Sequence, residues 1–305
     1  MLEHYNDLIG QCRTINDVNR VHIAFGNTIT PQEALLLHRT LFIDGLHSPP
    51  ASHPDRMFGD AELKASARDW VDRLREAHDL IRKPIVEPFM RRDIRKSVTL
   101  YTDGGVPEEK TLLLTLPGAN HRLMMPIASF LQNLPARSTD VVLIRDGTRS
   151  EFRGGLHGIS DSLEGLAAGL PDLLGMSRYR RRSGLGVSAG GLPILIIGLQ
   201  LGFDSVLASG AGSPFHPKWQ RPGFPTVAER LRAGSVDGRL KHVVVIHGAQ
   251  SQRDGESARD IASCIDAKVL PISYPGIDVQ HNALYPMSIH GDRAAFLVRQ
   301  LRLND

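Results

Sequence analysis

Residues 183–201 constrain the fold of this chain more than any other stretch. The first half holds the pattern Gly-x-Ser-x-Gly, with Ser188 between Gly186 and Gly190, and the second half, from Leu192 onward, is almost wholly apolar. This pattern predicts a short strand, a tight turn with the serine at its tip, and a buried helix. Such a turn lifts the serine hydroxyl clear of the backbone, where a substrate can reach it.

The two glycines beside Ser188 have a steric explanation. Strand and helix run close together at such a turn and the serine adopts a strained backbone angle, so we expect a Cβ at Gly186 or Gly190 to collide with its neighbours. The helix N-terminus behind Ser188 adds partial positive charge where an oxyanion would form. A glycine-rich turn before a helix can also serve packing or cradle a phosphate, so these five residues alone leave the function open.

Composition describes an ordinary globular protein. With 305 residues, 41% of them hydrophobic and 23% charged, the chain can bury one large core, with or without an appendage. A net charge of +3 gives no argument for nucleic-acid binding. The N-terminal residues carry acids where an export signal would be basic and apolar, and the apolar run 192–201 is too short to span a bilayer. Cys12 and Cys264 lack metal-like spacing, so we expect a cytoplasmic protein with reduced thiols.

Residues 1–95 differ in pattern from the rest of the chain. A capping box at 30–33, with proline at the first helical position, predicts a helix that runs towards Phe42. Apolar residues at helical spacing predict an amphipathic helix over 60–81, and residues 21–25 are compatible with a lone strand. We therefore expect residues 1–95 to form a mainly helical N-terminal extension that serves as a lid or docking region.

Residues 96–305 alternate between strand and helix patterns. Apolar strands are expected at 97–101, 111–116, 140–144, 183–185, 205–209, 241–246 and 268–272, and helices at 124–134, 160–174, 192–201 and 293–303. This alternation predicts an α/β fold with a mostly parallel sheet covered by helices on both faces. Ligands of such sheets gather at the carboxyl ends of the strands. The basic run 178–182 is expected to cap a helix end, with phosphate contact as the alternative.

Residues 96–305 resemble the α/β-hydrolase superfamily. The matching pieces are the segment Leu116-Pro117-Gly118-Ala119-Asn120 after an early strand, the Gly186–Gly190 turn, an acid after the penultimate strand and a histidine after the last one. The resemblance implies Ser188 as nucleophile, Asp254 as the orienting acid and His281 as general base. It implies no cofactor.

The same resemblance implies an oxyanion hole made of two backbone N–H groups. One would come from Ala189, and the other from Ala119 or Asn120. The chain departs from the family pattern in two places. The strand before the serine, at 183–185, is short and poorly apolar, and Pro193 falls where a helix normally needs an N–H.

The acid and the base each have rivals in the sequence. Asp254 is the first carboxylate in the loop expected after the strand at 241–246, but Glu256 and Asp260 follow closely, and Asp254 could instead be an N-cap or a surface acid. Beyond the acid, only His281 and His290 remain, and His290 lies near the start of the last helix, where helix capping would explain it. The histidines show no HExxH or comparable spacing, so no metal site is expected.

These residues predict a serine hydrolase that cleaves a carboxylic ester through an acyl-enzyme. An acyltransferase, for instance one that transfers acyl groups to a sugar hydroxyl, or a thioesterase would use the same three side chains. The alternative from a different functional class is a protein without catalytic activity that binds a partner through its helical extension. The oligomeric state stays open.

Basic residues follow several of the expected strands. His121 and Arg122 lie beside the oxyanion turn, Arg149 and Arg153 follow the next strand, and Lys218 and Arg221 could join them. If these side chains surround the serine, the mouth of the site is positive, and the substrate is a small-molecule or glycan ester with an anionic group. The alternative is that they are solvated surface residues that point elsewhere.

Overall fold

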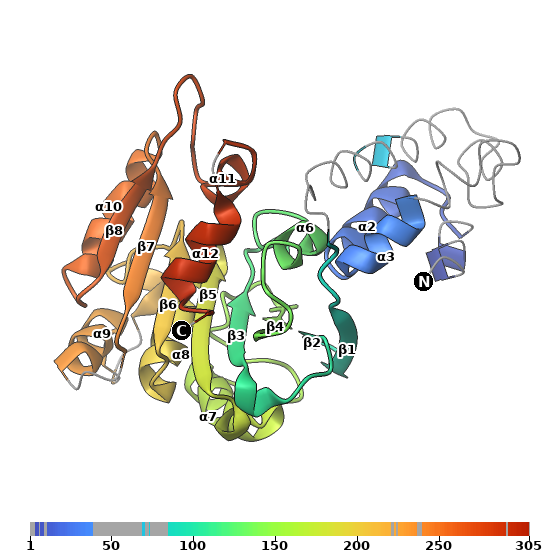
Figure 1. The fold of residues 1–305 in the computed structure, drawn as a ribbon. Helices are drawn as coiled ribbons and strands as arrows, with labels where there is room; N and C mark the ends of the chain where they lie inside the picture. The colour runs from blue at the N-terminus through green and yellow to red at the C-terminus, as the bar shows by residue number, and fades with distance from the viewer. Residues whose placement is uncertain are drawn as a thin grey trace, which may run out of the picture. The chain divides into compact units, whose positions relative to one another are not determined.

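The structure, a computed structural model, describes residues 4–5, 7–8, 11–38, 69–70, 73, 85–220, 223, 225–236, 240–290 and 292–304 (Figure 1). The chain divides into two compact units. The first comprises Met1–Phe89 and Pro126–Gln132, and the second comprises Met90–Met125 and Asn133–Asp305. A short segment between two strands of the second unit is therefore part of the first.

The first unit is helical where it is described. Its elements are α2 (Ile15–Gly26), α3 (Pro31–His38) and α6 (Ile127–Leu131). Thr30 and Glu33 exchange side-chain-to-backbone hydrogen bonds at the start of α3, which confirms the predicted capping box. A small apolar core joins the three helices and contains Tyr5, Val18, Phe25, Leu37 and Ala128.

One expectation for this unit is wrong, and a second one concerns residues that mostly lie outside the described part of the chain. The strand expected at 21–25 is wrong, because these residues belong to α2. Val18, His22 and Phe25 recur at helical spacing and are buried on one face, and a Thr14–Asp17 capping box starts the helix. The helix expected over 60–81 lies outside the described residues except for 69–70 and 73, which are helical.

The second unit contains an eight-stranded sheet within the described residues. Its strands are β1 (Met90–Arg95), β2 (Val98–Thr102), β3 (Thr111–Leu116), β4 (Thr139–Ile144), β5 (Arg181–Val187), β6 (Ser205–Ser209), β7 (Val243–Gly248) and β8 (Lys268–Ile272). The strand order is β1-β2-β4-β3-β5-β6-β7-β8. The pairs β1–β2 and β2–β4 are antiparallel and all others are parallel, which confirms the mostly parallel sheet.

Two strands differ from the sequence expectation. β1 was not expected, because Met90–Arg95 is charged and mostly exposed, as an edge strand can be. β5 begins at Arg181 and has seven residues, since it pairs along its length with β3, from Thr111 opposite Arg181 to Leu116 opposite Gly186. The end of the basic run 178–182 therefore lies in a strand, and the helix-capping interpretation is wrong for those residues.

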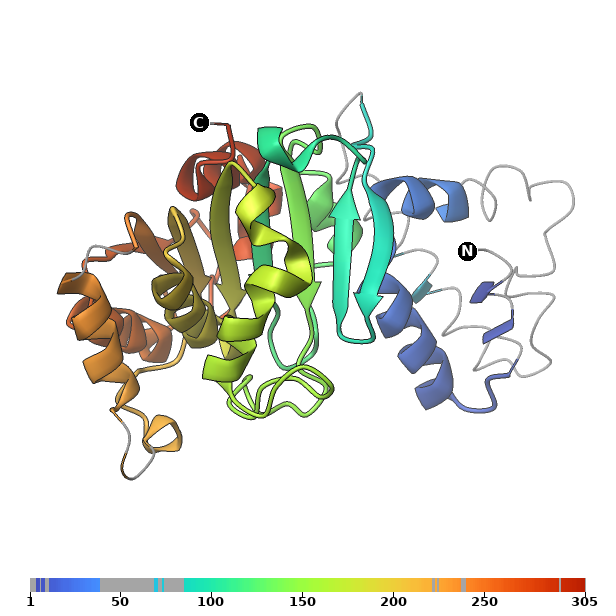
Figure 2. The same cartoon turned by 90° about the horizontal axis from the view of Figure 1, so that it is seen from below.

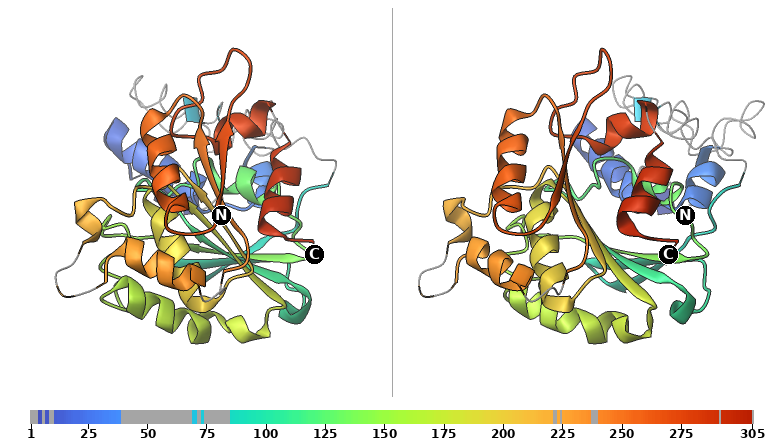
Figure 3. Two further views of the ribbon diagram at one scale, coloured as in Figure 1. Left: turned by 90° about the vertical axis from the view of Figure 1, so that its left-hand side faces the viewer. Right: turned by 60° about the vertical axis from the view of Figure 1, so that its left-hand side comes forward.

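Helices cover both faces of the sheet. They are α7 (Leu163–Leu174), α8 (Gly191–Leu201), α9 (Val227–Val236), α10 (Gln252–Ala262), α11 (Leu284–His290) and α12 (Arg293–Leu301), with short 3-10 turns η2 (Pro107–Glu109), η3 (Met176–Arg178), η4 (Ser188–Gly190) and η5 (Pro217–Trp219). Helices α7 to α9 lie on one face and α12 on the other (Figures 2 and 3). The Ser183 and Ser205 hydroxyls both donate to the Leu301 carbonyl and so tie α12 to the sheet. No helix among the described residues has the length and apolar character needed to cross a membrane.

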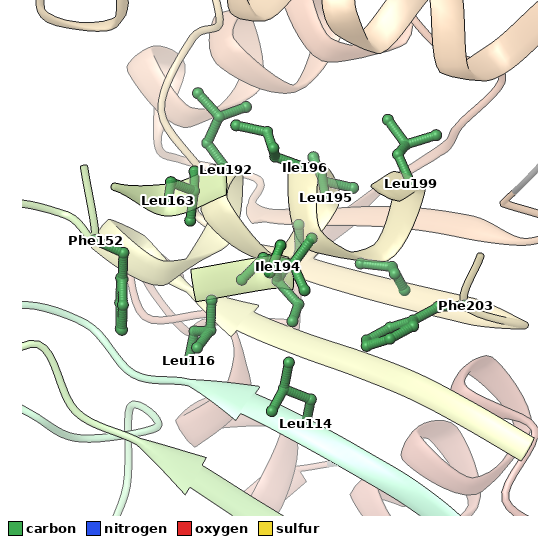
Figure 4. Packing of buried hydrophobic residues seen from close by; sticks show 14 of the residues in the cluster. Leu114, Leu116, Phe152, Leu163, Leu192, Ile194, Leu195, Ile196, Leu199 and Phe203 are labelled. Atoms are coloured by element: carbon green, nitrogen blue, oxygen red, sulfur yellow. The ribbon is translucent and has the colours of Figure 1, made fainter. Parts of the chain in front are cut away.

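Helix α8 is the centre of the larger core. Its residues from Gly191 to Leu199 are buried, and Figure 4 shows Ile194 between the helix and the side chains of Leu114 and Leu116 below it. A Cβ on Gly184 would lie 2.7 Å from Ile194 Cγ1, so the glycines of β5 let this helix approach closely. Pro193 is the third residue of α8, where an N–H has no intrahelical acceptor, and it therefore costs the helix no hydrogen bond.

Candidate active site

Ser188 lies at the turn between β5 and α8, at the carboxyl end of the central strand. Its backbone φ is 51°, in the left-handed region that non-glycine residues seldom adopt. A Cβ on Gly186 would lie 2.2 Å from the Gly190 carbonyl oxygen, and one on Gly190 would lie 2.2 Å from the Leu116 carbonyl oxygen. Both partners are backbone atoms that cannot rotate away, so the turn requires glycine at both positions, as the sequence pattern predicted.

His281 connects Ser188 to Asp254 through two hydrogen bonds. Its Nε2 lies 2.8 Å from Ser188 Oγ and its Nδ1 lies 2.8 Å from Asp254 Oδ2. The three side chains come from segments that are far apart in the sequence, after β5, β7 and β8. The sheet brings them together because these strands are parallel neighbours or near neighbours and end at the same edge.

Two glycines leave the space that the His281 loop occupies. Gly210, at φ 57° after β6, packs under the imidazole, since a Cβ there would lie 2.9 Å from His281 Cε1. Gly248, at the end of β7, leaves no space for a Cβ, which would lie 1.9 Å from the Gln280 carbonyl oxygen. Larger side chains at either position would push the loop, and with it the imidazole, away from the serine.

Asp254 lies in the first turn of α10, whereas the sequence analysis placed it in a loop. β7 and α10 are joined by only three residues, so the helix begins earlier than expected. The side chain is buried at 9% exposure. Burial acts to raise the pKa of Asp254, but the hydrogen bond and charge of His281, together with Ser251 and the charge of Arg253, hold the pKa below its ordinary value. The carboxylate is therefore ionised near neutral pH.

The imidazole of His281 is half exposed, at 51%. The hydrogen bond to Asp254 raises its pKa above the ordinary value, burial opposes this change, and the Asp254 charge adds to it. An imidazole held by a carboxylate on Nδ1 directs Nε2 at the serine and accepts a proton more readily there.

The rival residues have other contacts. Glu256 is exposed and accepts a hydrogen bond from Gln252, while Asp260 accepts one from the Ser213 hydroxyl. His290 ends α11 rather than lying at the start of α12, and its ring lies 5.5 Å from that of Tyr274. The capping explanation offered for His290 is wrong, because Asp292 caps α12.

The turn after β3 lies against Ser188. Its Gly118 N–H donates to the Arg122 carbonyl oxygen, and a Cβ on Gly118 would lie 3.3 Å from Ser188 Cβ. Ala119 and Asn120 form the exposed tip of this turn. Ala189 directly follows the serine and is the second residue of η4, where a backbone N–H has no partner within the helix.

Asn282, directly after His281, connects the loop of that histidine to the segment that follows β3. The sequence analysis missed this contact. Asn282 Nδ2 donates to the Met124 carbonyl oxygen at 2.9 Å, and its Oδ1 accepts from the Tyr285 N–H at the start of α11. The Ser209 hydroxyl lies 3.5 Å from Met124 Sδ. An asparagine directly after the histidine candidate was the available signal, but its partner is more than 150 positions away and no local pattern indicates it.

The expected basic residues separate into two groups. His121 is half-buried, and its pKa lies below the ordinary value, first because of burial and then because Arg145 and Arg149 oppose its protonation, with Asp146 acting the other way. The charged side chains around His121 are therefore mainly positive.

Arg153 belongs to the second group. Its guanidinium stacks over the Trp219 ring and donates to the Lys218 carbonyl oxygen, and Lys218 forms an ion pair with Glu151. Arg221 lies outside the described residues. Across the described ranges, no three histidine, cysteine, aspartate or glutamate side chains are placed to hold a metal ion.

Comparisons with known proteins give structural neighbours only. Neither a protein-family model nor a curated protein matches the sequence. Est1E from Butyrivibrio proteoclasticus is 12% identical with a TM-score of 0.45, over 71% of this chain and 100% of that one. A dienelactone hydrolase from Anabaena variabilis is 13% identical, with a TM-score of 0.44 and the same coverage. An S-formylglutathione hydrolase from Staphylococcus aureus is 13% identical with a TM-score of 0.48, over 70% and 96% of the two chains.

The second unit has the arrangement of strands, turn and side chains that defines the α/β-hydrolase fold. A serine stands on a strained strand-to-helix turn above a mostly parallel sheet, and an acid and then a histidine follow it along the chain. The chain thus has the α/β-hydrolase fold, as the resemblance in its sequence implied.

Proposed function

We propose that this protein is a serine hydrolase that cleaves a carboxylic ester through an acyl-enzyme on Ser188. The observation that supports it most directly is the line of two 2.8 Å hydrogen bonds from Ser188 through His281 to Asp254. The buried cysteines Cys12 and Cys264 are free, which suits the reducing cytoplasm as the setting.

The proposed chemistry begins with proton transfer. His281 Nε2 takes the proton from Ser188 Oγ as this oxygen bonds to the ester carbonyl carbon, and Asp254 stabilises the resulting imidazolium. The protonated His281 then gives the proton to the departing alcohol, which leaves an acyl group on Ser188. Water, deprotonated by His281, attacks the acyl carbon and releases the carboxylic acid.

The oxyanion of each tetrahedral intermediate needs two donors. The Ala189 N–H, at the start of η4, is one candidate, and the turn at Ala119 and Asn120 supplies the other. Support for the second donor is that the turn packs against the serine, since a Cβ on Gly118 would lie 3.3 Å from Ser188 Cβ. A wrongly placed donor in such a hole costs about 10²- to 10³-fold in kcat.

Labelling with a fluorophosphonate, followed by mass mapping of the adduct, tests this proposal. We expect a single adduct on the peptide that holds Ser188, and we expect Ser188→Ala to lose both labelling and ester turnover while it stays folded. Ser213→Ala is the matched control, because Ser213 bonds to Asp260 and has no role in the proposed chemistry. Ester turnover that persists in folded Ser188→Ala would contradict the mechanism.

We further propose that the ester carries an anionic group near the scissile bond. Support comes from the charges around His121, whose pKa is lowered first by burial and then by Arg145 and Arg149. Arg122 is the next residue along the chain and would add to this positive charge. Neutral and anionic esters of matched leaving group should be compared from low to high salt. We expect Arg149→Ala to lower kcat/KM for the anionic ester by roughly tenfold at low salt, with the exposed Arg299→Ala unchanged. Equal rates for both esters at every salt concentration would exclude this preference.

A further inference from the structure

A pocket lies in the second unit, apart from Ser188 and His281. Its volume is about 780 Å³, and neither of those residues is among its lining. The walls come from residues 150–154 after β4, residues 161–164 at the start of α7, and residues 218–220 before α9, with Ile196 of α8 between them. A volume of this size is within the range of small-molecule binding sites.

Polar and apolar groups contribute about equally to the inner surface, and most of the charges at the rim are paired. Leu163 and Ile196, which Figure 4 labels on the core around α8, contribute the apolar surface together with Trp219 and Val227. Lys218 pairs with Glu151 at 2.7 Å, and Arg230 pairs with Glu164. These two pairs leave the charges of Arg153 and Asp161 unmatched in the described part of the chain.

Arg153 is held in position without a carboxylate partner among the described residues. Its Nε donates to the Ser150 carbonyl oxygen at 3.0 Å, its Nη1 donates to the Lys218 carbonyl oxygen at 3.1 Å, and its guanidinium carbon lies 5.9 Å from the Trp219 ring centroid. Two of its five N–H donors are used, so three remain for a ligand. Asp161 is exposed, and no contact within the described residues holds it in place. The fixed charge of this pocket is therefore the positive one.

Trp219 adds a second donor that lacks an acceptor. The residue is 8% exposed, and its indole Nε1 is buried with no hydrogen-bond partner in the described structure. Buried N–H groups are normally paired, so this one calls for an acceptor that the described residues do not supply. Arg153 and Trp219 are in contact, and both need acceptor oxygens.

We propose that this pocket binds a small molecule with a flat apolar body and one anionic, oxygen-bearing group. The anionic oxygens accept hydrogen bonds from Arg153 and from Trp219 Nε1, and the apolar body packs against Leu163 and Ile196. The guanidinium is already anchored by two hydrogen bonds, so little side-chain entropy is lost when the anion binds. This site does not depend on the proposed ester chemistry at Ser188.

Titration of the full chain with 1-anilinonaphthalene-8-sulfonate tests the proposal, because this probe joins a flat apolar body to one sulfonate. We expect one saturable site, with energy transfer from tryptophan that is lost in Trp219→Phe. Arg153→Met should weaken binding about tenfold, as loss of a charged hydrogen bond predicts, and Arg153→Lys should weaken it less. N-phenyl-1-naphthylamine, the neutral counterpart, should bind Arg153→Met and the unchanged protein alike, and the exposed Arg299→Met should behave like the unchanged protein.

The test also separates this pocket from the active site. Protein whose Ser188 carries a fluorophosphonate adduct, and the Ser188→Ala variant, should bind the sulfonate probe with unchanged affinity. Loss of probe binding in the adduct, or equal affinity of Arg153→Met and the unchanged protein, would overturn the proposal. Neither result would affect the labelling test of Ser188, so the two proposals fail independently.

Discussion

At the scale of single residues, the pKa of the His281 imidazole depends on its contact with Asp254. In the proposed mechanism the imidazole must be neutral to accept the Ser188 proton, so kcat/KM is expected to fall as the pH drops through its pKa. Asp254 raises that pKa through a hydrogen bond and its charge. The carboxylate thus moves the acidic limb of the pH profile upward while it orients the ring for attack.

Asp254→Asn separates these two effects. We expect kcat/KM at pH 8 to fall by roughly 10⁴-fold, because the amide no longer holds the productive tautomer. We also expect the acidic limb to move to lower pH, because the pKa of His281 falls once the negative charge is gone. The pH dependence of ester turnover measures both, with His290→Gln as a control that should change neither. An acidic limb that stays in place would show that Asp254 does not set the protonation of His281.

At the scale of elements, prediction from the sequence succeeded where the pattern is local. The Gly-x-Ser-x-Gly turn, the capping box at Thr30 and the apolar central strands are each determined by residues within a few positions of one another. Prediction failed for β1, whose charged residues form a strand only because β2 offers a free edge. It also failed for residues 21–25, where His22 and Phe25 lie on the buried face of a helix while the β-branched Ile23 is exposed.

Contacts between distant segments were beyond the reach of the sequence. The position of Asp254 in α10, the bond from Asn282 to Met124 and the pocket at Trp219 all depend on how loops from different strands meet at one edge. The order serine, acid, histidine indicated which residues to consider, but only the folded sheet places His281 within hydrogen-bond distance of both partners.

The first strands of the parallel sheet contain a buried charge cluster that the sequence did not indicate. Lys110, at 1% exposure, forms ion pairs with Asp103 and Asp140, and the Tyr179 hydroxyl donates to Asp140. Lys110→Met would leave Asp140 buried without a positive partner, which we expect to lower the free energy of unfolding by about 3–5 kcal/mol. Chemical denaturation measures this. Lys241→Met is the control, because its exposed pair with Asp204 is worth less than about 1 kcal/mol. Similar losses in the two variants would contradict the role assigned to Lys110.

At the scale of the whole molecule, the two units are interleaved along the chain. Residues 126–132 belong to the first unit by their packing, although they lie between β3 and β4. All five residues of α6 are buried, and Ala128 packs in the core of the first unit with Leu37 and Val18. Removal of residues 1–89 would therefore take away the residues against which Ala128 packs.

Such a truncation separates the solubility of the protein from its chemistry. We expect the shortened protein to aggregate more readily, because Ala128 of α6 loses its apolar packing partners when the first unit is missing. We expect its soluble fraction still to react with a fluorophosphonate at Ser188, since Ser188, Asp254 and His281 all belong to the second unit. Light scattering measures the first effect and adduct mapping the second. A soluble, folded truncation that no longer reacts would mean that the N-terminal unit helps to build the active site, as a lid would, and is more than a docking region.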